Sequence, residues 1–104
     1  MTRGDIYRVR LPSRRGREQA GTRYAVIVGA DELLGLSRAI IAPTSRSAAP
    51  ATFRPRIDLQ GEPTRVLVEQ LRAVDLSGLG DAAGHLAPQE QRAVDEALAL
   101  ILSL

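Results

Sequence analysis

Residues 16–28 read Gly-Arg-Glu-Gln-Ala-Gly-Thr-Arg-Tyr-Ala-Val-Ile-Val, and they contain the clearest structural signal in the chain. A polar segment bounded by Gly16 and Gly21 leads into an apolar run at residues 25–28, which is typical of a buried strand. Arg23 lies where this loop meets the strand. A strand holds its backbone in place, so a residue at such a junction can meet a ligand at a fixed position. The stretch therefore predicts a strand with a functional arginine at its start.

Short apolar or alternating runs recur along the chain and predict further strands. We expect strands over residues 4–11, 24–28, 38–42, 53–59, 64–68, 72–75 and 82–86. In the first of these, Ile6 is out of phase with the face formed by Tyr7, Val9 and Leu11. Pro55 lacks an amide donor, so we expect this strand to be an edge strand or to contain a bulge.

Clusters of Pro, Gly, Ser and Thr separate these runs and predict the connections. We expect loops over residues 12–22 and 43–52, a turn at 61–63 and one helical turn at 30–36. From Pro88 onward the apolar period changes to that of a helix, and proline suits a first helical position. The apolar face of this helix consists of Val94, Ala97, Leu98, Ile101 and Leu102.

A series of short strands closed by a C-terminal helix predicts a mainly β fold with some α structure. We expect a small antiparallel barrel or curled sheet. With 104 residues, of which 44% are hydrophobic, we expect one domain spanning residues 1–104. No apolar run approaches the roughly 20 residues of a membrane helix, and no apolar region follows the N-terminal residues, so we expect neither a membrane span nor a secretory signal.

All 14 basic residues are arginine, and they are unevenly placed. Residues 1–72 hold 13 arginines against 7 acidic residues, whereas residues 73–104 hold 1 arginine against 5. A basic body is typical of a protein with a polyanionic partner, and guanidinium groups match phosphate oxygens in bidentate pairs. A solvated surface with no partner, on a chain from a high-GC genome, is the alternative.

The residue inventory restricts the chemistry that this chain can perform. There is no cysteine, which excludes disulfides and thiolate metal sites, and there is one histidine. No spacing of Asp, Glu and His indicates a metal site, and no nucleophile-elbow motif is present. We therefore expect no metal and no cofactor. Any catalysis would rely on arginine, hydroxyls, carboxylates and the substrate itself.

Several short motifs stand in a characteristic order along the chain. They are Arg3-Gly4-Asp5-Ile6-Tyr7, Glu18-Gln19-Ala20-Gly21, Arg23, Pro43-Thr44-Ser45 and Glu69-Gln70-Leu71-Arg72-Ala73-Val74-Asp75. Together they resemble the MazF/PemK family of toxin endoribonucleases, over nearly the whole chain. The resemblance implies an SH3-like barrel with appended helices, a homodimer, a cytoplasmic location and a cognate antitoxin that neutralises the protein.

The resemblance also implies a reaction, the sequence-specific and metal-independent cleavage of single-stranded RNA. The ribose 2′-hydroxyl would attack the adjacent phosphate, leaving 2′,3′-cyclic phosphate and 5′-hydroxyl ends. Arg23 and Thr44 match the catalytic pair of the family. Arg23 would hold the non-bridging oxygens and protonate the departing 5′-oxygen, and Thr44 would donate a hydrogen bond to the phosphate. Glu18 is a candidate for orienting the attacking hydroxyl or its base.

Further residues are candidates for RNA contact. They are Arg14, Arg15, Arg17, Glu18, Gln19, Tyr24, Ser45 and Gln70. Tyr24 stands where the family usually has proline, and its ring could stack on a base. His85 lies in an expected strand, and we expect a structural role for it.

Two other functions remain open from the sequence. One is a non-enzymatic inhibitor that binds a protein, like the gyrase-poisoning CcdB branch of the same fold. The other is an RNA-binding module without activity. The presence of both Arg23 and Thr44 favours the nuclease, because the inhibitor branch does not need this pair.

Overall fold

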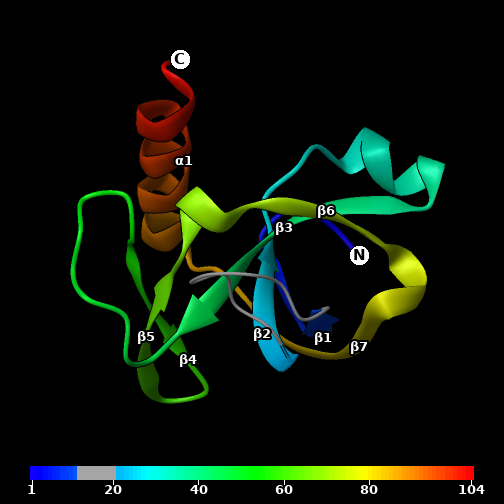
Figure 1. Ribbon diagram of the computed structural model, residues 1–104, viewed down its shortest axis with the longest axis horizontal. Helices are drawn as coiled ribbons and strands as arrows, with labels where there is room; N and C mark the ends of the chain where they lie inside the picture. The colour runs from blue at the N-terminus through cyan, green and yellow to red at the C-terminus, as the bar shows by residue number, and fades with distance from the viewer. Residues whose placement is uncertain (12–20) are drawn as a thin grey trace.

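The computed structural model describes residues 1–11 and 21–104, and in this part of the chain the strands form one curled antiparallel sheet (Figure 1). The strands are β1 (Asp5–Leu11), β2 (Gly21–Ile27), β3 (Arg38–Ser45), β4 (Arg56–Leu59), β5 (Glu62–Val66), β6 (Arg72–Asp75) and β7 (Leu79–His85). The helical elements are the 3₁₀ turns η1 (Asp31–Leu36), η2 (Val68–Gln70) and η3 (Leu76–Gly78) and the helix α1 (Pro88–Leu102). The expected mainly β fold with a C-terminal helix is confirmed.

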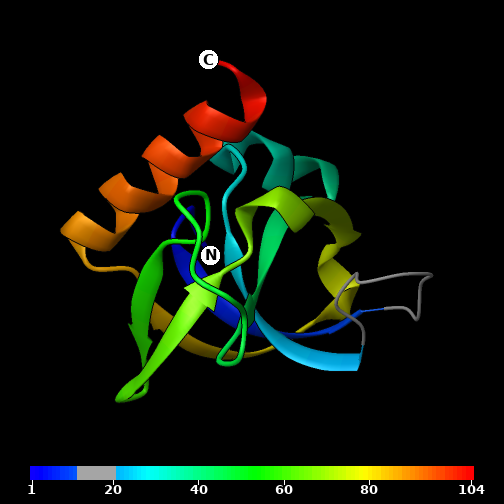
Figure 2. The same cartoon turned by 60° about the vertical axis from the view of Figure 1, so that its left-hand side comes forward.

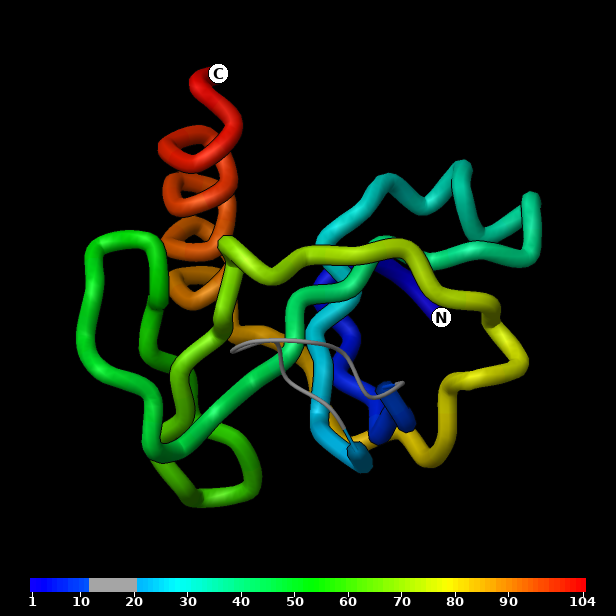
Figure 3. The backbone as a smooth tube through the Cα atoms, viewed as in Figure 1, coloured from blue at the N-terminus to red at the C-terminus, as the bar shows by residue number. Residues whose placement is uncertain are grey.

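Strand β3 is at the centre of the sheet (Figure 1). The strand order is β4-β5-β3-β2-β1-β7, and β6 also pairs with β3. One edge of β3 pairs with β2 from Ile41 to Pro43. Its other edge pairs first with β6, over residues 38–41, and then with β5 at Thr44 and Ser45. The trace in Figure 3 shows β3 crossing the molecule from the end of η1 to the β4–β5 hairpin.

Strand β3 is longer than expected, because residues 43–45 belong to it and not to the predicted loop. Pro43 has no amide to donate, which favours a loop when the sequence is read alone. In the structure, the Pro43 carbonyl accepts a hydrogen bond from the Leu67 amide at 2.8 Å. The nitrogen and carbonyl of a strand residue point to the same side. The missing amide therefore falls where β3 passes from β6 to β5, and no ladder bond is lost.

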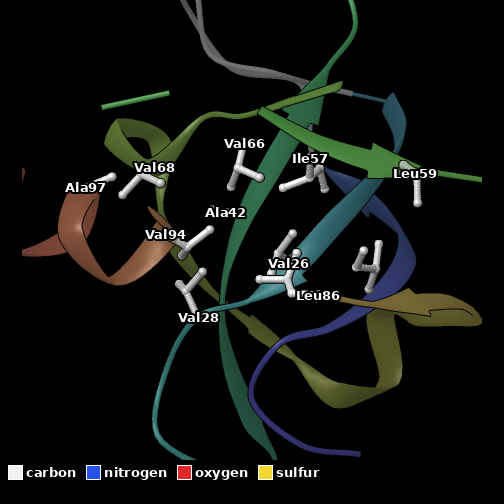
Figure 4. Close-up of a cluster of buried hydrophobic side chains, with 11 residues drawn as sticks. Val26, Val28, Ala42, Ile57, Leu59, Val66, Val68, Leu86, Val94 and Ala97 are labelled. Carbon is white, nitrogen blue, oxygen red and sulfur yellow. The ribbon is translucent and has the colours of Figure 1, made fainter. Parts of the chain in front are cut away.

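The apolar runs of β2 and β3 are continuous because both faces of the sheet are covered. Val26 and Ala42 belong to a core that includes Val94 and Ala97 of α1 (Figure 4). Ala25 and Ile27 of β2 and Ala39 and Ile41 of β3 belong to a second core on the opposite face. This arrangement explains why Ile6 of β1 is out of phase with the other apolar residues of that strand. Ile6 packs in the first core and Val9 and Leu11 in the second.

Helix α1 begins at Pro88, as expected, and Glu90 fixes its first turn. The Glu90 carboxylate accepts the Ala87 amide at 2.8 Å and the Asp58 amide of β4 at 2.7 Å, which joins the helix start to the sheet edge. Leu102 lies beside Leu98 on the predicted apolar face, with half of its surface exposed. None of the helices in residues 1–11 and 21–104 has the length and apolar character of a membrane span.

The β4–β5 hairpin differs in detail from the prediction. Its turn consists of Gln60 and Gly61, at φ 54° and 84°, whereas we expected residues 61–63. Positive φ at both central positions favours glycine and gives the twist that a two-residue hairpin needs. Four predicted strands are shifted and are observed at Gly21–Ile27, Arg56–Leu59, Glu62–Val66 and Leu79–His85. The edge position of β4 is confirmed. The predicted loop 12–22 lies outside the described residues except for its last two residues, which begin β2.

Three carboxylates hold the first residues of the chain. Asp5 accepts the Thr2 amide at 2.8 Å, and Asp31 accepts the Thr2 hydroxyl at 2.8 Å and the Arg3 amide at 2.6 Å. The Arg3 guanidinium forms an ion pair with Asp95 of α1 at 2.6 Å. The N-terminal segment therefore connects η1, β1 and α1.

These contacts lower the pKa of all three carboxyl groups. For Asp31, the main cause of the lowered pKa is the hydrogen bond that its carboxylate accepts from the Thr2 hydroxyl. Burial alone would raise the pKa of Asp5 and Asp95. In each group this effect is outweighed by hydrogen bonds, chiefly with His85 for Asp5 and with Arg3 for Asp95. Carboxyl groups whose pKa is lower in the folded state stabilise the protein above the unfolded pKa and lose this contribution as pH falls through the folded pKa.

We predict that the free energy of unfolding decreases as pH falls below about 4, because the usual pKa of these groups is 3.8. Urea unfolding between pH 7 and pH 2.5 measures this. Combining Asp5→Asn, Asp31→Asn and Asp95→Asn should flatten the decrease, whereas Asp81→Asn, at an exposed position of β7, should leave it unchanged. An equally steep decrease in the triple variant would contradict the assignment.

Candidate functional site

A pocket of about 330 Å³ opens where β2, β3 and β5 meet, at the end of β3 next to the β4–β5 hairpin. It is lined by Thr22, Arg23, Tyr24, Thr44, Ser45, Arg46, Ser47, Leu59 and Thr64. The residues come from β2, from the end of β3 and the two residues after it, and from the β4–β5 hairpin, so only the folded sheet brings them together.

Thr44 fixes the geometry of the pocket. Its side chain is buried, and its hydroxyl donates a hydrogen bond of 2.8 Å to the carbonyl of Tyr24. The paired register of β2 and β3 begins at Ala25 and Pro43, so this side-chain bond joins the two strands one residue beyond it. A buried hydroxyl needs such a partner, because leaving it without one costs about 1–3 kcal/mol. Thr44 therefore has a structural role in addition to any chemical one.

Arg23 is exposed and lies just beyond the paired part of β2 and β3. Directly paired residues of antiparallel strands share a face. Arg23 pairs with Val9 of the second core, and Thr44 pairs with Val66 of the first core. The two side chains thus leave opposite faces of the sheet, and both reach the pocket because it lies at an open end of the β2–β3 ladder.

The lining of the pocket has the chemistry of an anion site. It combines the guanidinium groups of Arg23 and Arg46 with the hydroxyls of threonine, serine and tyrosine side chains. No carboxylate is among the lining residues in the described part of the chain. Guanidinium and hydroxyl groups donate hydrogen bonds to phosphate oxygens, and positively charged side chains around a hollow favour an anionic ligand.

The chain beyond Thr44 is held in a defined path. The Ser47 amide donates to the Ser45 hydroxyl at 3.3 Å, which turns the backbone at the end of β3. Farther along, Arg54 donates two hydrogen bonds to Glu69, at 2.7 and 2.9 Å, and one to the Ala49 carbonyl at 3.1 Å. Glu69, part of a motif that carries the family resemblance, thus anchors the 46–55 loop.

The structure brings together four of the residues singled out from the sequence: Arg23, Tyr24, Thr44 and Ser45. Gln70 lies in η2 and does not line the pocket. The other candidates, Arg14, Arg15, Arg17, Glu18 and Gln19, lie outside the described residues.

Sequence reasoning missed five lining residues: Thr22, Arg46, Ser47, Leu59 and Thr64. Two of them, Arg46 and Ser47, directly follow Thr44 and Ser45. The continuous polar run could therefore have predicted that they belong to the same site. Leu59 and Thr64 come from the hairpin, and nothing local in the sequence places them here.

The only histidine of the chain lies away from the pocket. His85 Nδ1 and Asp5 Oδ1 share a hydrogen bond of 2.6 Å between β7 and β1. This contact supports the predicted structural role of His85. In the described residues, neither histidine nor carboxylate stands ready at the pocket to act as a base.

Comparison with known proteins agrees with this geometry. Residues 2–102 match the family described as "PemK-like, MazF-like toxin of type II toxin-antitoxin system". The chain belongs to this family. A Mycobacterium tuberculosis (strain ATCC 25618 / H37Rv) protein named as a toxin, Rv3098A, is 38% identical over 104 residues, which cover 98% of this chain and 97% of that protein.

Solved structures of PemK/MazF-like toxins share the fold of this chain. MazF from Deinococcus radiodurans superposes with a TM-score of 0.86 at 19% identity, covering 100% of this chain and 97% of that one. An endoribonuclease in complex with its cognate antitoxin, from Mycobacterial species, superposes with a TM-score of 0.84 at 18% identity, covering 100% and 96%. The curled sheet with its C-terminal helix is therefore the MazF fold.

We predict that Thr44→Ala lowers the free energy of unfolding by about 1–2 kcal/mol, because the Tyr24 carbonyl loses its hydroxyl partner. Thr44→Ser keeps the hydroxyl and should lose less. Urea unfolding of the two variants measures the difference. Equal losses for serine and alanine would show that the threonine methyl group, and not the hydrogen bond, stabilises this end of the sheet.

Proposed function

We propose that this PemK/MazF-like toxin is an endoribonuclease that cleaves single-stranded RNA in a sequence-specific, metal-independent reaction. The observation that carries the proposal is the pocket shared by Arg23 and Thr44, which is cationic, rich in hydroxyls and free of carboxylates among its described lining residues. The structural neighbours include a protein named as an endoribonuclease with its cognate antitoxin, which supports the same class of activity.

The substrate supplies the nucleophile in this reaction. The ribose 2′-hydroxyl gives up its proton to a base and forms a bond to the adjacent phosphorus, while the bond from phosphorus to the 5′-oxygen breaks and this oxygen takes up a proton. The products are a 2′,3′-cyclic phosphate and a 5′-hydroxyl. The protein has to stabilise a crowded phosphorane with two negative charges, which fixed donors achieve well. Arg23 holds the non-bridging oxygens and provides the proton for the departing 5′-oxygen. Glu18 is our candidate for orienting the attacking hydroxyl or its base.

Thr44 acts at the phosphate through its single hydroxyl hydrogen. In the free protein this hydrogen is directed at the Tyr24 carbonyl. Donation to the phosphate therefore requires the hydroxyl to exchange one acceptor for another when RNA binds. The exchange couples substrate binding to the junction between β2 and β3, and Tyr24, at the same junction, can stack its ring on a base.

The remaining features of the proposal concern partners and organisation. Residues 1–104 act as one toxin domain, which works as a homodimer in the cytoplasm and is neutralised by a cognate antitoxin. Additional RNA contacts come from Arg14, Arg15, Arg17, Gln19, Ser45 and Gln70. Phosphate contacts of this kind position an RNA strand, whereas base contacts determine which sequence is cut.

Cleavage of a long single-stranded RNA by the purified protein tests the proposal. We predict cleavage in excess EDTA, with ends mapped by primer extension and 5′-hydroxyl groups that a polynucleotide kinase labels without prior phosphatase treatment. A 2′-deoxy substitution at the cut site should stop the reaction, because the nucleophile is then missing. Activity that requires added magnesium, or 5′-phosphate ends, would contradict the mechanism.

Two variants test the role of Arg23, one that removes its charge and one that keeps the charge but not the guanidinium group. Arg23→Ala should slow cleavage by about 100- to 1,000-fold, because one preorganised donor is lost. Arg23→Lys should recover little activity, since an ammonium group cannot form the bidentate fork. Circular dichroism verifies that both variants are folded. Wild-type rates in folded Arg23→Ala would remove this residue from the mechanism.

A further inference from the structure

Three strands place a polar row beside the pocket, on the face of the sheet that points away from the first core. Ser45 of β3 pairs with Arg65 of β5, and Arg65 pairs with Arg56 of β4. Paired residues share a face, so the three side chains form one cross-strand row. At a strand spacing of about 4.8 Å, the row extends about 10 Å outward from the end of β3.

The two arginines of this row stand directly opposite each other, which is an unfavourable arrangement. In residues 1–11 and 21–104, no carboxylate forms an ion pair with either of them. The nearby Asp58 carboxylate accepts the Gly61 amide at 2.8 Å. Arg65 donates to the Arg54 carbonyl at 3.0 Å, which holds its guanidinium in place without reducing its charge. The folded protein thus carries a local repulsion that a bound anion would relieve.

This row is continuous with the catalytic pocket. A second hollow of about 300 Å³ is lined by Arg46, Arg56, Arg65 and Thr64, among others. Arg46 and Thr64 also line the pocket of Arg23 and Thr44, so the two hollows share a wall. The 46–55 loop and the β4–β5 hairpin lie next to each other beyond the end of β3, in both views (Figures 1 and 2).

We propose that Arg46, Arg56 and Arg65 form an extended phosphate-binding surface, which holds the backbone of single-stranded RNA next to the scissile phosphate. This inference rests on the proposed function and specifies the path of the RNA strand on the protein. From the pocket, the RNA strand passes over the β4–β5 hairpin. The three guanidinium groups contact phosphates and not bases, so they contribute affinity and register without selecting the sequence.

The test uses a fluorescein-labelled 2′-O-methyl oligoribonucleotide of mixed sequence, which lacks the attacking hydroxyl. Fluorescence anisotropy gives its affinity over a range of salt concentrations. For single strands the logarithm of affinity changes with the logarithm of salt by about −0.7 for each neutralised phosphate. Combining Arg46→Ala, Arg56→Ala and Arg65→Ala should therefore make the slope shallower by about 2. The matched control is Arg38→Ala, at the opposite end of β3, which should leave the slope unchanged.

A single substitution provides an independent test on the edge strand. Arg56→Glu places a carboxylate opposite Arg65, so a repulsive pair becomes an attractive one. We expect the melting temperature of the free protein to rise by about 1–4 °C. Affinity for the oligonucleotide should fall. Should the triple variant fail to fold, this variant alone decides the question.

The outcomes separate the two proposals. A shallower slope in the triple variant together with weaker binding by Arg56→Glu supports the surface, whether or not wild-type protein cleaves RNA. Unchanged slopes and affinities in folded variants would overturn the surface while leaving the cleavage proposal intact. Failure of wild-type protein to bind the oligonucleotide at low salt would also overturn it. Absence of cleavage of 2′-hydroxyl RNA by wild-type protein bears only on the proposed function.

Discussion

The change of partner along strand β3 is the constraint on which the rest of the structure depends. One edge of β3 pairs with β6 as far as Ile41 and with β5 from Thr44 onward. Pro43, which has no amide hydrogen, occupies the break between the two partners. The break lets the β4–β5 hairpin leave the direction of the main sheet, and the pocket opens where β2, β3 and β5 diverge. The Thr44 hydroxyl joins β2 to β3 at this point.

The acidic and basic side chains of this chain have different locations and roles. Several carboxylates are engaged in the fold: Glu90 holds the start of α1, Glu69 holds the 46–55 loop through Arg54, and Asp95 holds the N-terminus. Several arginines, in contrast, lie at the surface. Arg56 of β4 pairs with Arg65 of β5, and Arg23 and Arg46 line the pocket. A modest net charge of +2 therefore coexists with a strongly cationic face beside the pocket.

Much of the fold was predictable from the sequence, because the strongest signals are local. The apolar run at residues 25–28 and the helical period after Pro88 both gave correct elements. The errors have tertiary causes. Pro43 and Ser45 carry the local signature of a loop, yet they belong to β3, because its change of partner removes the need for an amide at Pro43. No local pattern reports such an exchange of partners.

The candidate site was predictable in part for the same reason. Arg23 stood out as a polar residue at the start of an apolar run, and Thr44 through the family motif. Leu59 and Thr64 reach the pocket only because the hairpin folds back beside β3, and the opposition of Arg56 and Arg65 depends on the strand register. Contacts of this kind depend on which strands pair and in what register, and a single sequence does not give this information.

The location of RNA on this surface is the central claim, and amide chemical-shift mapping by NMR tests it most directly. Titration with the uncleavable 2′-O-methyl oligoribonucleotide should shift resonances of residues 22–24 and 44–47 most strongly, with a second group along the β4–β5 hairpin. Shifts confined instead to the apolar groove between α1 and Gly29, which Leu98 and Leu102 line, would contradict the account.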